Sequence, residues 1–457
     1  MNRLLALATS ALALAASPAL AQDVAITGAT IALGDGSEPV ENATVVVRGG
    51  RIVGAGSGIA VPAGIPVLDG SGVWVTPGLF ASLTELGIYD VQAVEDSNDV
   101  SASGSPFGAA LDVAPVINPN SQDIAYSRAG GVTRASVTPS AGASIFGGQG
   151  AIIDTGADYD AVVRPRAFQV VEMGERGARL AGGSRTSSHA LLRNALREAS
   201  SYGDDAQLTG RSQRNPSRTG DDVPLDPRLT GRAERDTDVL LTRFDAAALV
   251  PVVTGEQQLY VKVERASDIL SALALREEFP GLDMVLVGAT EGWMVADQIA
   301  AAGVPVIAAA LRDLPVSFEQ LAATQSNLGR LVDAGVRVAI GVYDSSGDHP
   351  RNLPQQAGNM VALNDVPGAT GLTWGEAFAA ITSVPAAIGG LEGEAGVLAP
   401  GALGDLVVWD GDPLELSSAP IRVFVEGVEQ PLTNHQTRLR DRYRSLDESE
   451  RPRAYEW

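Results

Sequence analysis

The sequence predicts an α/β protein made of a (β/α)8 TIM-like barrel and a small β-sandwich domain formed from the N- and C-terminal segments. Two observations predict this fold. Short apolar runs alternate with amphipathic stretches that end in glycine through the middle of the chain, and alternating apolar residues recur near both ends. Apolar strands followed by helices are typical of parallel βα units. A series of such units in a chain of 457 residues favours a closed barrel over an open sheet.

Residues 1–21 have the pattern of a secretory signal peptide. Arg3 gives a short basic start, LLALATSALALAA is an apolar run, and Ala19 and Ala21 form a small-residue cleavage site. The apolar run is too short to span a bilayer, and no later segment is longer and equally apolar. We therefore expect a secreted chain without a membrane span, located in a bacterial periplasm.

The composition excludes several classes of function. The chain has no cysteine, so it offers neither a disulfide framework nor a thiolate site. Its net charge of −22 argues against nucleic acid and anionic membranes as partners. Lys262 is the only lysine, which singles it out among the otherwise arginine-based cations.

The two ends of the chain are predicted to form the sandwich. Residues 22–75 give its N-terminal part and residues 391–432 its C-terminal part, because both contain short alternating apolar runs separated by glycine, aspartate and asparagine. The runs are VAITGATIAL, ATVVVRGGRIVGAG, PVLDGSGVWV, GDLVVWDGDPLE and IRVFVEGVEQPL.

Residues 76–390 are predicted to form the barrel. Predicted strands include VTRASVTP, QLYVKVE, DMVLVGA, VPVIAAA and VRVAIGVY, and predicted helices include SDILSALALREEF, EGWMVADQIAAAG and FEQLAATQSNLGRLVDAG. Residues 203–236 interrupt the alternation with a polar, arginine- and glycine-rich stretch, which we interpret as a surface insertion. Residues 433–457 form a highly charged tail, interpreted as a peripheral helix or arm.

Three stretches carry a resemblance to a known family. They are VVVRGGRIVGAG, VTPGLF and the C-terminal run TWGEAFAAITSVPAAIGGLEGEAGVLAPGALGDLVVWDGDPLE. Together they resemble the amidohydrolase superfamily, especially its imidazolonepropionase-like secreted members, from about Val24 to Glu429. The resemblance implies the barrel and its junction with the small domain. In that family a zinc ion at the C-terminal mouth of the barrel polarises a carbonyl and activates a water.

The metal-ligand positions of that family are not kept in this chain. A His-x-His pair follows the first barrel strand in the family, and the corresponding residues here are Leu83 and Glu85. The fifth-strand histidine corresponds to Lys262 and the sixth-strand histidine to Gly288. The general-base aspartate after the eighth strand corresponds to Asp344 only with a slip of one position, which would reverse its side-chain direction. We therefore expect no zinc and no other cofactor.

One metal alternative remains open. Of the three histidines only His349, in the loop after the eighth predicted strand, is expected near the mouth. A carboxylate site made of Glu85, Asp344 and Asp348 would suit Mg²⁺ or Ca²⁺, although nothing in the spacing is specific for either ion.

Lys262 and Glu85 occupy two positions that converge on the same ion in the family. An ammonium beside a carboxylate would keep the charge balance without a metal, and burying such a pair requires good geometry. We interpret Lys262 as a structural replacement for the cation. The alternative is a nucleophile or base whose pKa burial has lowered. Glu264 and Glu291 are alternative carboxylate partners, and with His349 they are the candidate ligand-binding residues.

Two functions follow. The first is an amidohydrolase-like scaffold with little or no catalysis, working beside an intact amidohydrolase homologue or as a homo-oligomer, with a small-molecule or small-peptide ligand. The second is an active hydrolase of carbon–nitrogen bonds that uses a rearranged site of Lys262, Glu85, Asp344 and His349. The loss of the ligand positions with retention of the fold-holding motifs favours the first function, because function is argued from a site and not from a fold.

Overall fold

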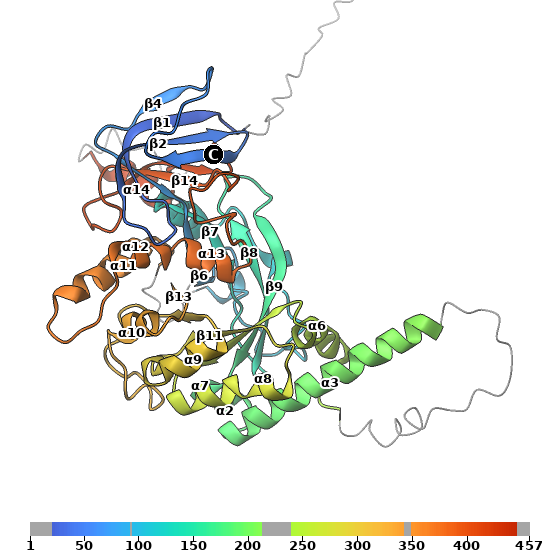
Figure 1. Ribbon diagram of the computed structural model, residues 1–457. Coiled ribbons are helices and arrows are strands. Elements are labelled where there is room, and N and C mark those ends of the chain that lie inside the picture. The colour runs from blue at the N-terminus through green and yellow to red at the C-terminus, as the bar shows by residue number, and fades with distance from the viewer. Residues whose placement is uncertain (1–20, 92–93, 213–238, 342–348, 446–457) are drawn as a thin grey trace, which may run out of the picture.

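The computed structural model describes residues 21–91, 94–212, 239–341 and 349–445, and it contains two β-sheets with helices around the larger one (Figure 1). Nearly all of the expected signal peptide lies outside the described residues. The same is true of the part of the polar insertion after residue 212, and of Asp344 and Asp348. Within the described residues, no helix has the length and apolar composition that crossing a bilayer requires.

Both ends of the chain contribute to the smaller sheet, as expected. Its strand order is β16-β15-β14-β5-β1-β2-β3, with β4 paired to β1. The N-terminal strands are β1 Val24–Ile31, β2 Val40–Arg48, β3 Arg51–Gly56, β4 Val67–Asp69 and β5 Trp74–Pro77. The C-terminal strands are β14 Leu406–Trp409, β15 Pro420–Val425 and β16 Val428–Glu429. β14 pairs antiparallel with β5 and so joins the two ends of the chain. The assignment of this domain as a two-layer sandwich stays a prediction.

The larger sheet forms the barrel. Its eight strands follow the chain in order from β6 to β13, and a bridge between Ser82 and Gly341 brings the first strand against the last. The strands are β6 Leu79–Thr84, β7 Val132–Val137, β8 Phe146–Asp154, β9 Val162–Glu172, β10 Gln258–Val263, β11 Met284–Gly288, β12 Val306–Ala308 and β13 Val338–Ile340. β6, β7 and β11 are buried along their whole length, which is typical of strands covered on both faces.

One strand departs from the predicted (β/α)8 pattern. β8 runs antiparallel to both β7 and β9, so two hairpins replace βα units on this side of the barrel. The glycine-rich sequence FGGQG is the start of this strand. Its glycines are required by close packing: a Cβ at Gly150 would lie 2.1 Å from the Phe168 ring.

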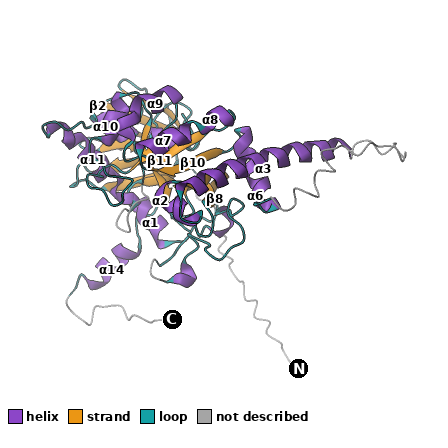
Figure 2. Cartoon of the chain, turned by 90° about the horizontal axis from the view of Figure 1, so that it is seen from below, coloured by secondary structure: helices purple, strands orange, loops and turns teal. Residues whose placement is uncertain are grey.

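Helices border the remaining strands, and Figure 2 shows α7, α8, α9 and α10 beside β10 and β11. The helices are α1 Gln122–Ala129, α2 Gly174–Leu180, α3 Arg185–Ser212, α6 Arg243–Thr254, α7 Ala266–Leu273, α8 Leu275–Glu278, α9 Ala296–Ala302, α10 Asn327–Asp333, α11 Leu353–Ala362, α12 Trp374–Ala379, α13 Ser383–Ile388 and α14 His435–Tyr443. Two predictions need correction. α3 continues to Ser212, so the insertion does not begin at residue 203. Of the helix expected over residues 318–335, only the second half forms, as α10.

The interior of the barrel is apolar. Phe80, Leu83, Phe168, Tyr260 and Val287 belong to one buried cluster. The rings of Phe168 and Tyr260 stack at 4.1 Å between centroids. Side chains alternate along β9 and β10, so Val170 and Tyr260 point inward while Val171 and Val261 belong to the outer core between strands and helices.

Candidate functional site

Lys262 forms an ion pair at the mouth of the barrel, but not with the predicted partner. Its Nζ lies 3.1 Å from Oε1 of Glu172, the last residue of β9. The two residues are direct neighbours in the parallel register of β9 and β10, so their side chains leave the sheet on the same side. The exposed fractions of the side chains are only 17% and 9%. Arg176 Nε approaches the same Glu172 oxygen at 3.5 Å.

Glu85 lies close to this pair without joining it. Within the described residues, no ion pair connects Glu85 to Lys262, so the predicted direct contact is wrong. Glu85 is partly buried just after β6. Its burial raises its pKa, and the Lys262 charge acts in the opposite direction, which places both groups in one electrostatic environment.

Leu83 occupies the other histidine position and fills the barrel. The register of β6 against β7 shifts between Ala81 and Thr84, and Leu83 within this irregularity has a φ of 60°. The Leu83 N–H donates to Ser136 Oγ at 2.8 Å, and its side chain is 1% exposed in the interior cluster. A bulge that turns a side chain is typical of strand ends near functional sites. Here the side chain it turns inward is a hydrocarbon.

The sixth-strand position is also closed to a ligand side chain. Val287, not Gly288, is the register neighbour of Lys262 on β11 and points into the barrel. Gly288 has a φ of 92°, and a Cβ there would lie 2.3 Å from the Glu264 carboxylate. Glu264 is not the partner of Lys262, contrary to the alternative that the sequence offered. Its Oε2 instead accepts hydrogen bonds from Thr290 N at 3.0 Å and Thr290 Oγ1 at 2.6 Å. Burial raises the pKa of Glu264 to about 7.

Two further carboxylates hold loops at the mouth. Glu291 is buried, and its two carboxylate oxygens accept hydrogen bonds from the N–H groups of Ala266 and Ala322, each at 3.1 Å, so it is not the partner of Lys262. Glu319 accepts from Glu175 N at 2.6 Å and from Arg185 Nη2 at 2.9 Å. The structure therefore gives Glu291 a position-fixing role between chain segments.

His349 belongs to a small polar network beside the mouth. Its Nδ1 accepts a hydrogen bond from Arg351 N at 3.4 Å, which leaves Nε2 to carry the proton. Nε2 lies 3.7 Å from Asp123 Oδ1, and the Tyr126 ring meets the imidazole edge-on at 4.7 Å. Contact with His349 and the hydroxyl hydrogen bond from Tyr89 hold the pKa of Asp123 below its ordinary value, despite partial burial.

Tyr89 connects this network electrostatically to Glu85. Burial is the main reason that the pKa of the Tyr89 hydroxyl is raised, followed by its hydrogen bond to Asp123 and by the Glu85 charge. Tyr89 therefore keeps its proton at neutral pH and acts as a hydrogen-bond donor. Glu85, Tyr89, Asp123 and His349 thus form a second polar group next to the Lys262–Glu172 pair.

The side chains at the mouth do not fit the zinc ion of the related family. Leu83 and Val287 have no ligand atoms, and Lys262 is paired with Glu172. Across the described residues, no three histidine, aspartate or glutamate side chains come together in a way that could hold a metal ion. The alternative carboxylate site with Asp344 and Asp348 lies outside these residues and stays a prediction.

Sequence reasoning missed Glu172, Asp123 and Tyr89. Glu172 ends an apolar strand, AFQVVE, whose alternation directs it into the barrel, and this pattern was the available signal. Asp123 and Tyr89 lie in segments without a comparable pattern. The arrangement offers a lysine ammonium, a carboxylate with a raised pKa and a histidine 3.7 Å from an aspartate, next to the apolar interior of the barrel.

Comparison with known proteins finds a family match for part of the chain. Residues 281–434 match the model of the amidohydrolase family. A segment of 60 residues is 38% identical to amidohydrolase tasK of Hapsidospora irregularis and spans 13% of this chain and 6% of that protein. An amidohydrolase from Thermotoga maritima MSB8 has a similar structure, with a TM-score of 0.74, 23% identity and coverage of 89% of this chain and 99% of that one.

A triazine hydrolase variant is a more distant structural match, with a TM-score of 0.51, 17% identity and coverage of 91% of this chain and 97% of that one. At these identities the structural likeness defines the fold alone: an amidohydrolase-type α/β barrel with a separate sheet. The family match covers about a third of the chain, so the chain resembles the amidohydrolase family over residues 281–434.

Proposed function

We propose that this protein is a periplasmic, metal-independent member of the amidohydrolase superfamily that acts as a binding or partner subunit with little or no catalysis. The observation that carries the proposal is the Lys262–Glu172 ion pair at 3.1 Å above the buried Leu83. An ammonium group takes the place of the cation and a hydrocarbon takes the place of a ligand. Reversing only one of these two replacements would not restore a metal site. Both replacements therefore support the same proposal.

Metal analysis of the purified mature protein tests this proposal. We expect zinc far below one ion per chain, both as purified and after incubation with excess zinc followed by desalting. A stoichiometric, tightly held zinc ion would refute the proposal. The Thermotoga maritima amidohydrolase, expressed and desalted in the same way, serves as a comparison protein of the same fold.

The location and partner are part of the same proposal. The leader pattern supports export, and we expect the mature chain in the periplasmic fraction with its N-terminus at Gln22. The partner would be an intact amidohydrolase homologue or a second copy of this chain. Co-purification of a homologue from the source organism, or a stable dimer by light scattering, would support the partner role. A monomer that retains no homologue and binds no ligand would contradict it.

A hydrolase of carbon–nitrogen bonds is the second candidate, and one observation favours it. Glu85, with its raised pKa, shares an electrostatic environment with Lys262, and Asp123 lies 3.7 Å from His349 nearby. Such neighbours are typical of acid–base sites. Hydrolysis of small amides, lactams or dipeptides that persists in a chelator and is lost in Lys262→Met would favour this candidate. Equal rates in the wild type and in Lys262→Met would exclude it.

A further inference from the structure

The loop that joins β12 to α10 presents its apolar side chains to solvent. Large apolar residues within this short stretch have exposed fractions between 42% and 82%. They are Leu311, Leu314, Val316, Phe318 and Leu321. Single exposed leucines are ordinary on a protein surface, whereas a contiguous apolar patch marks a contact with another molecule. Residues 311–321 are called the apolar loop below.

Polar side chains of the apolar loop point the opposite way, into the protein. Glu319 and Gln320 are 8% and 4% exposed. Glu319 accepts hydrogen bonds from Glu175 N and Arg185 Nη2, and Gln320 Oε1 accepts one from Val316 N at 3.3 Å. Loops ordinarily expose polar side chains, and a run of exposed apolar residues indicates a function.

The end of the apolar loop is held from within. The Trp293 indole N–H donates a hydrogen bond to Ala322 O at 2.9 Å, and Ala322 N donates one to Glu291 Oε1 at 3.1 Å. The guanidinium carbon of Arg330 lies over the Trp293 ring, 4.5 Å from its centroid. A surface that is preformed in this way loses little conformational entropy when a partner binds.

The apolar loop lies at the mouth end of the barrel. It follows β12, which is parallel to β11, and β9, β10 and β11 are parallel in turn, so these strands end on one side of the sheet. Glu319 reaches the residues directly after β9, because a Cβ at Gly174 would lie 2.4 Å from its carboxylate. The loop therefore extends along the rim of the mouth, from β12 toward β9.

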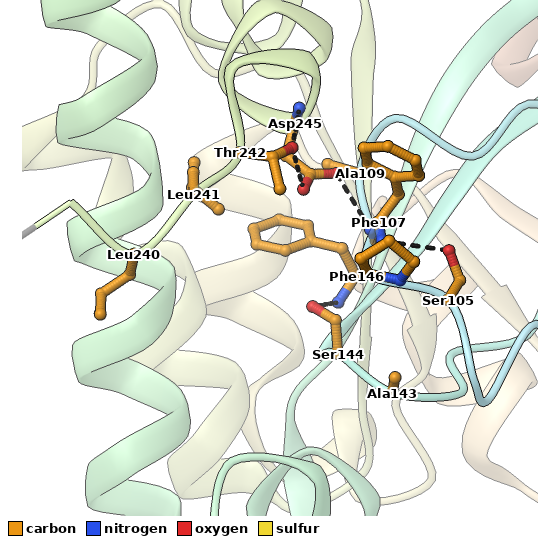
Figure 3. Close-up of a pocket in the computed structure, with 12 residues that line it drawn as sticks. Ser105, Phe107, Ala109, Ala143, Ser144, Phe146, Leu240, Leu241, Thr242 and Asp245 are labelled. Carbon is orange, nitrogen blue, oxygen red and sulfur yellow. Dashed lines mark hydrogen bonds between the residues drawn. The ribbon is translucent and has the colours of Figure 1, made fainter.

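Another group of exposed apolar residues, at the start of α6, does not form a comparable patch. Figure 3 shows Phe107 and Leu240 together with the polar side chains of Ser105 and Ser144. The Phe107 and Phe244 rings also contact each other edge-to-face, with 5.6 Å between centroids, which covers part of their surface. That surface mixes polar and apolar groups and offers a weaker apolar contact than the apolar loop.

The area and the charge of the apolar loop fit a second copy of this chain. The exposed apolar side chains amount to roughly 600 Å², so two loops packed together would bury about 1,200 Å², the lower end of the range for stable interfaces. A two-fold contact needs only one patch, because both copies carry it. The solvent-facing charges of Arg312 and Asp313 cancel, so the two patches meet without net repulsion on a chain of net charge −22.

We propose that the apolar loop is the centre of a two-fold contact between two copies of this chain. The inference rests on the partner role in the proposed function and deepens it, because it names the surface through which the partner subunit binds. The contact would place the second copy against the rim of the barrel mouth.

Sedimentation equilibrium of the whole mature chain tests the proposal. We expect a monomer–dimer equilibrium with a dissociation constant on the order of 10 µM. Raising the NaCl concentration should strengthen dimerisation, because salt screens the repulsion between two acidic chains. A chain that stays monomeric at about 500 µM, or a dimer that salt weakens, would overturn the proposal.

A matched pair of variants tests the surface. Leu314→Asp should weaken dimerisation at least about tenfold, because the contact would bury a carboxylate without a partner. Leu416→Asp is the control, since Leu416 is 78% exposed against 74% for Leu314 and lies between β14 and β15 of the smaller sheet. It should leave the dissociation constant unchanged, and urea unfolding should show both variants to be as stable as the wild type. Equal dissociation constants for the two variants would refute the assignment.

Spin labels locate the contact without disturbing the patch. The chain has no cysteine, so Asp313→Cys and Leu416→Cys each carry a single nitroxide label. Double electron–electron resonance should give a shorter distance between the two labels of a dimer in Asp313→Cys than in Leu416→Cys. The reverse order would place the contact elsewhere and overturn the inference, while the partner role would stand.

Other outcomes separate this inference from the proposed function. A monomer without zinc would overturn the inference alone. A dimer that holds stoichiometric zinc would overturn the metal-independent function and leave the surface in place. A homologue retained by the wild type and lost by Leu314→Asp would show a different occupant and refute the assignment to a second copy.

Discussion

The Lys262–Glu172 ion pair gives the most direct test of how the barrel mouth is held together. We expect Lys262→Met to lower the free energy of unfolding by about 2 kcal/mol. Breaking a fully buried pair costs about 3–5 kcal/mol, and breaking an exposed pair about 0.2–1 kcal/mol. This pair lies between these cases, since its side chains are 17% and 9% exposed, and Arg176, at 3.5 Å, remains to accompany Glu172.

A double-mutant cycle separates the pair from the packing of each residue. Glu172→Leu alone should lower the free energy of unfolding by about as much as Lys262→Met, because it leaves the ammonium of Lys262 unpaired in a mostly buried site. Combining both changes should cost clearly less than the sum, since no unpaired charge remains. Unfolding in urea, followed by tryptophan fluorescence, measures all four proteins.

Arg48→Met provides the control. Arg48 approaches Asp23 at 3.9 Å with side chains 67% and 43% exposed, and its loss should change stability by less than about 0.5 kcal/mol. If Lys262→Met were as mild as this control, or if the two mouth variants were simply additive, the pair would not be the replacement for a cation that we infer.

Three other variants test the packing and the buried carboxylate. Leu83→Ala should lower the free energy of unfolding by about 2–5 kcal/mol through the cavity it leaves, and a change below about 1 kcal/mol would show that the mouth collapses around it. Gly150→Ala should cost at least about 1–3 kcal/mol in urea unfolding, because the new methyl group meets the Phe168 ring. Glu264→Gln should remove a pH dependence of the free energy of unfolding. The pKa of Glu264 is raised from 4.5 to about 7 on folding, so the wild type loses stability as pH rises through this range, and the variant lacks this loss. Identical pH profiles of stability for the wild type and Glu264→Gln would contradict the assignment.

The elements that the sequence predicted correctly are those with a strong local pattern. QLYVKV and DMVLVG became β10 and β11 because short apolar runs bounded by turns have few alternatives. The sequence did not predict β8 because its glycines conceal the alternation of side chains. Gly150 is required because the Phe168 ring of the next strand packs against it. Such a requirement depends on three-dimensional contact and leaves no local signal.

The site was predicted in part for the same reason. The absence of ligand side chains at Leu83 and Gly288 followed from the resemblance to the family, and the rarity of lysine drew attention to Lys262. The partner of Lys262 depends on the register between β9 and β10, and Glu172 precedes it by 90 residues. Aligning the chain with the family strand by strand cannot predict this register where the residues of the family motif have been replaced. Gly288 illustrates the limit, because the inward-facing residue is its neighbour Val287.

The antiparallel strand β8 also has a consequence for how the chain folds. β7, β8 and β9 are joined by short hairpin connections, whereas each parallel pair needs a longer crossover whose ends must meet at a greater entropic cost. Local pairings form faster than distant ones. We therefore expect this meander to be the nucleus on which the barrel assembles, with Ser82 and Gly341 meeting last. In pulse-labelling hydrogen exchange during refolding, the β8 amides should gain protection before those of β12, and the reverse order would disprove this sequence of events.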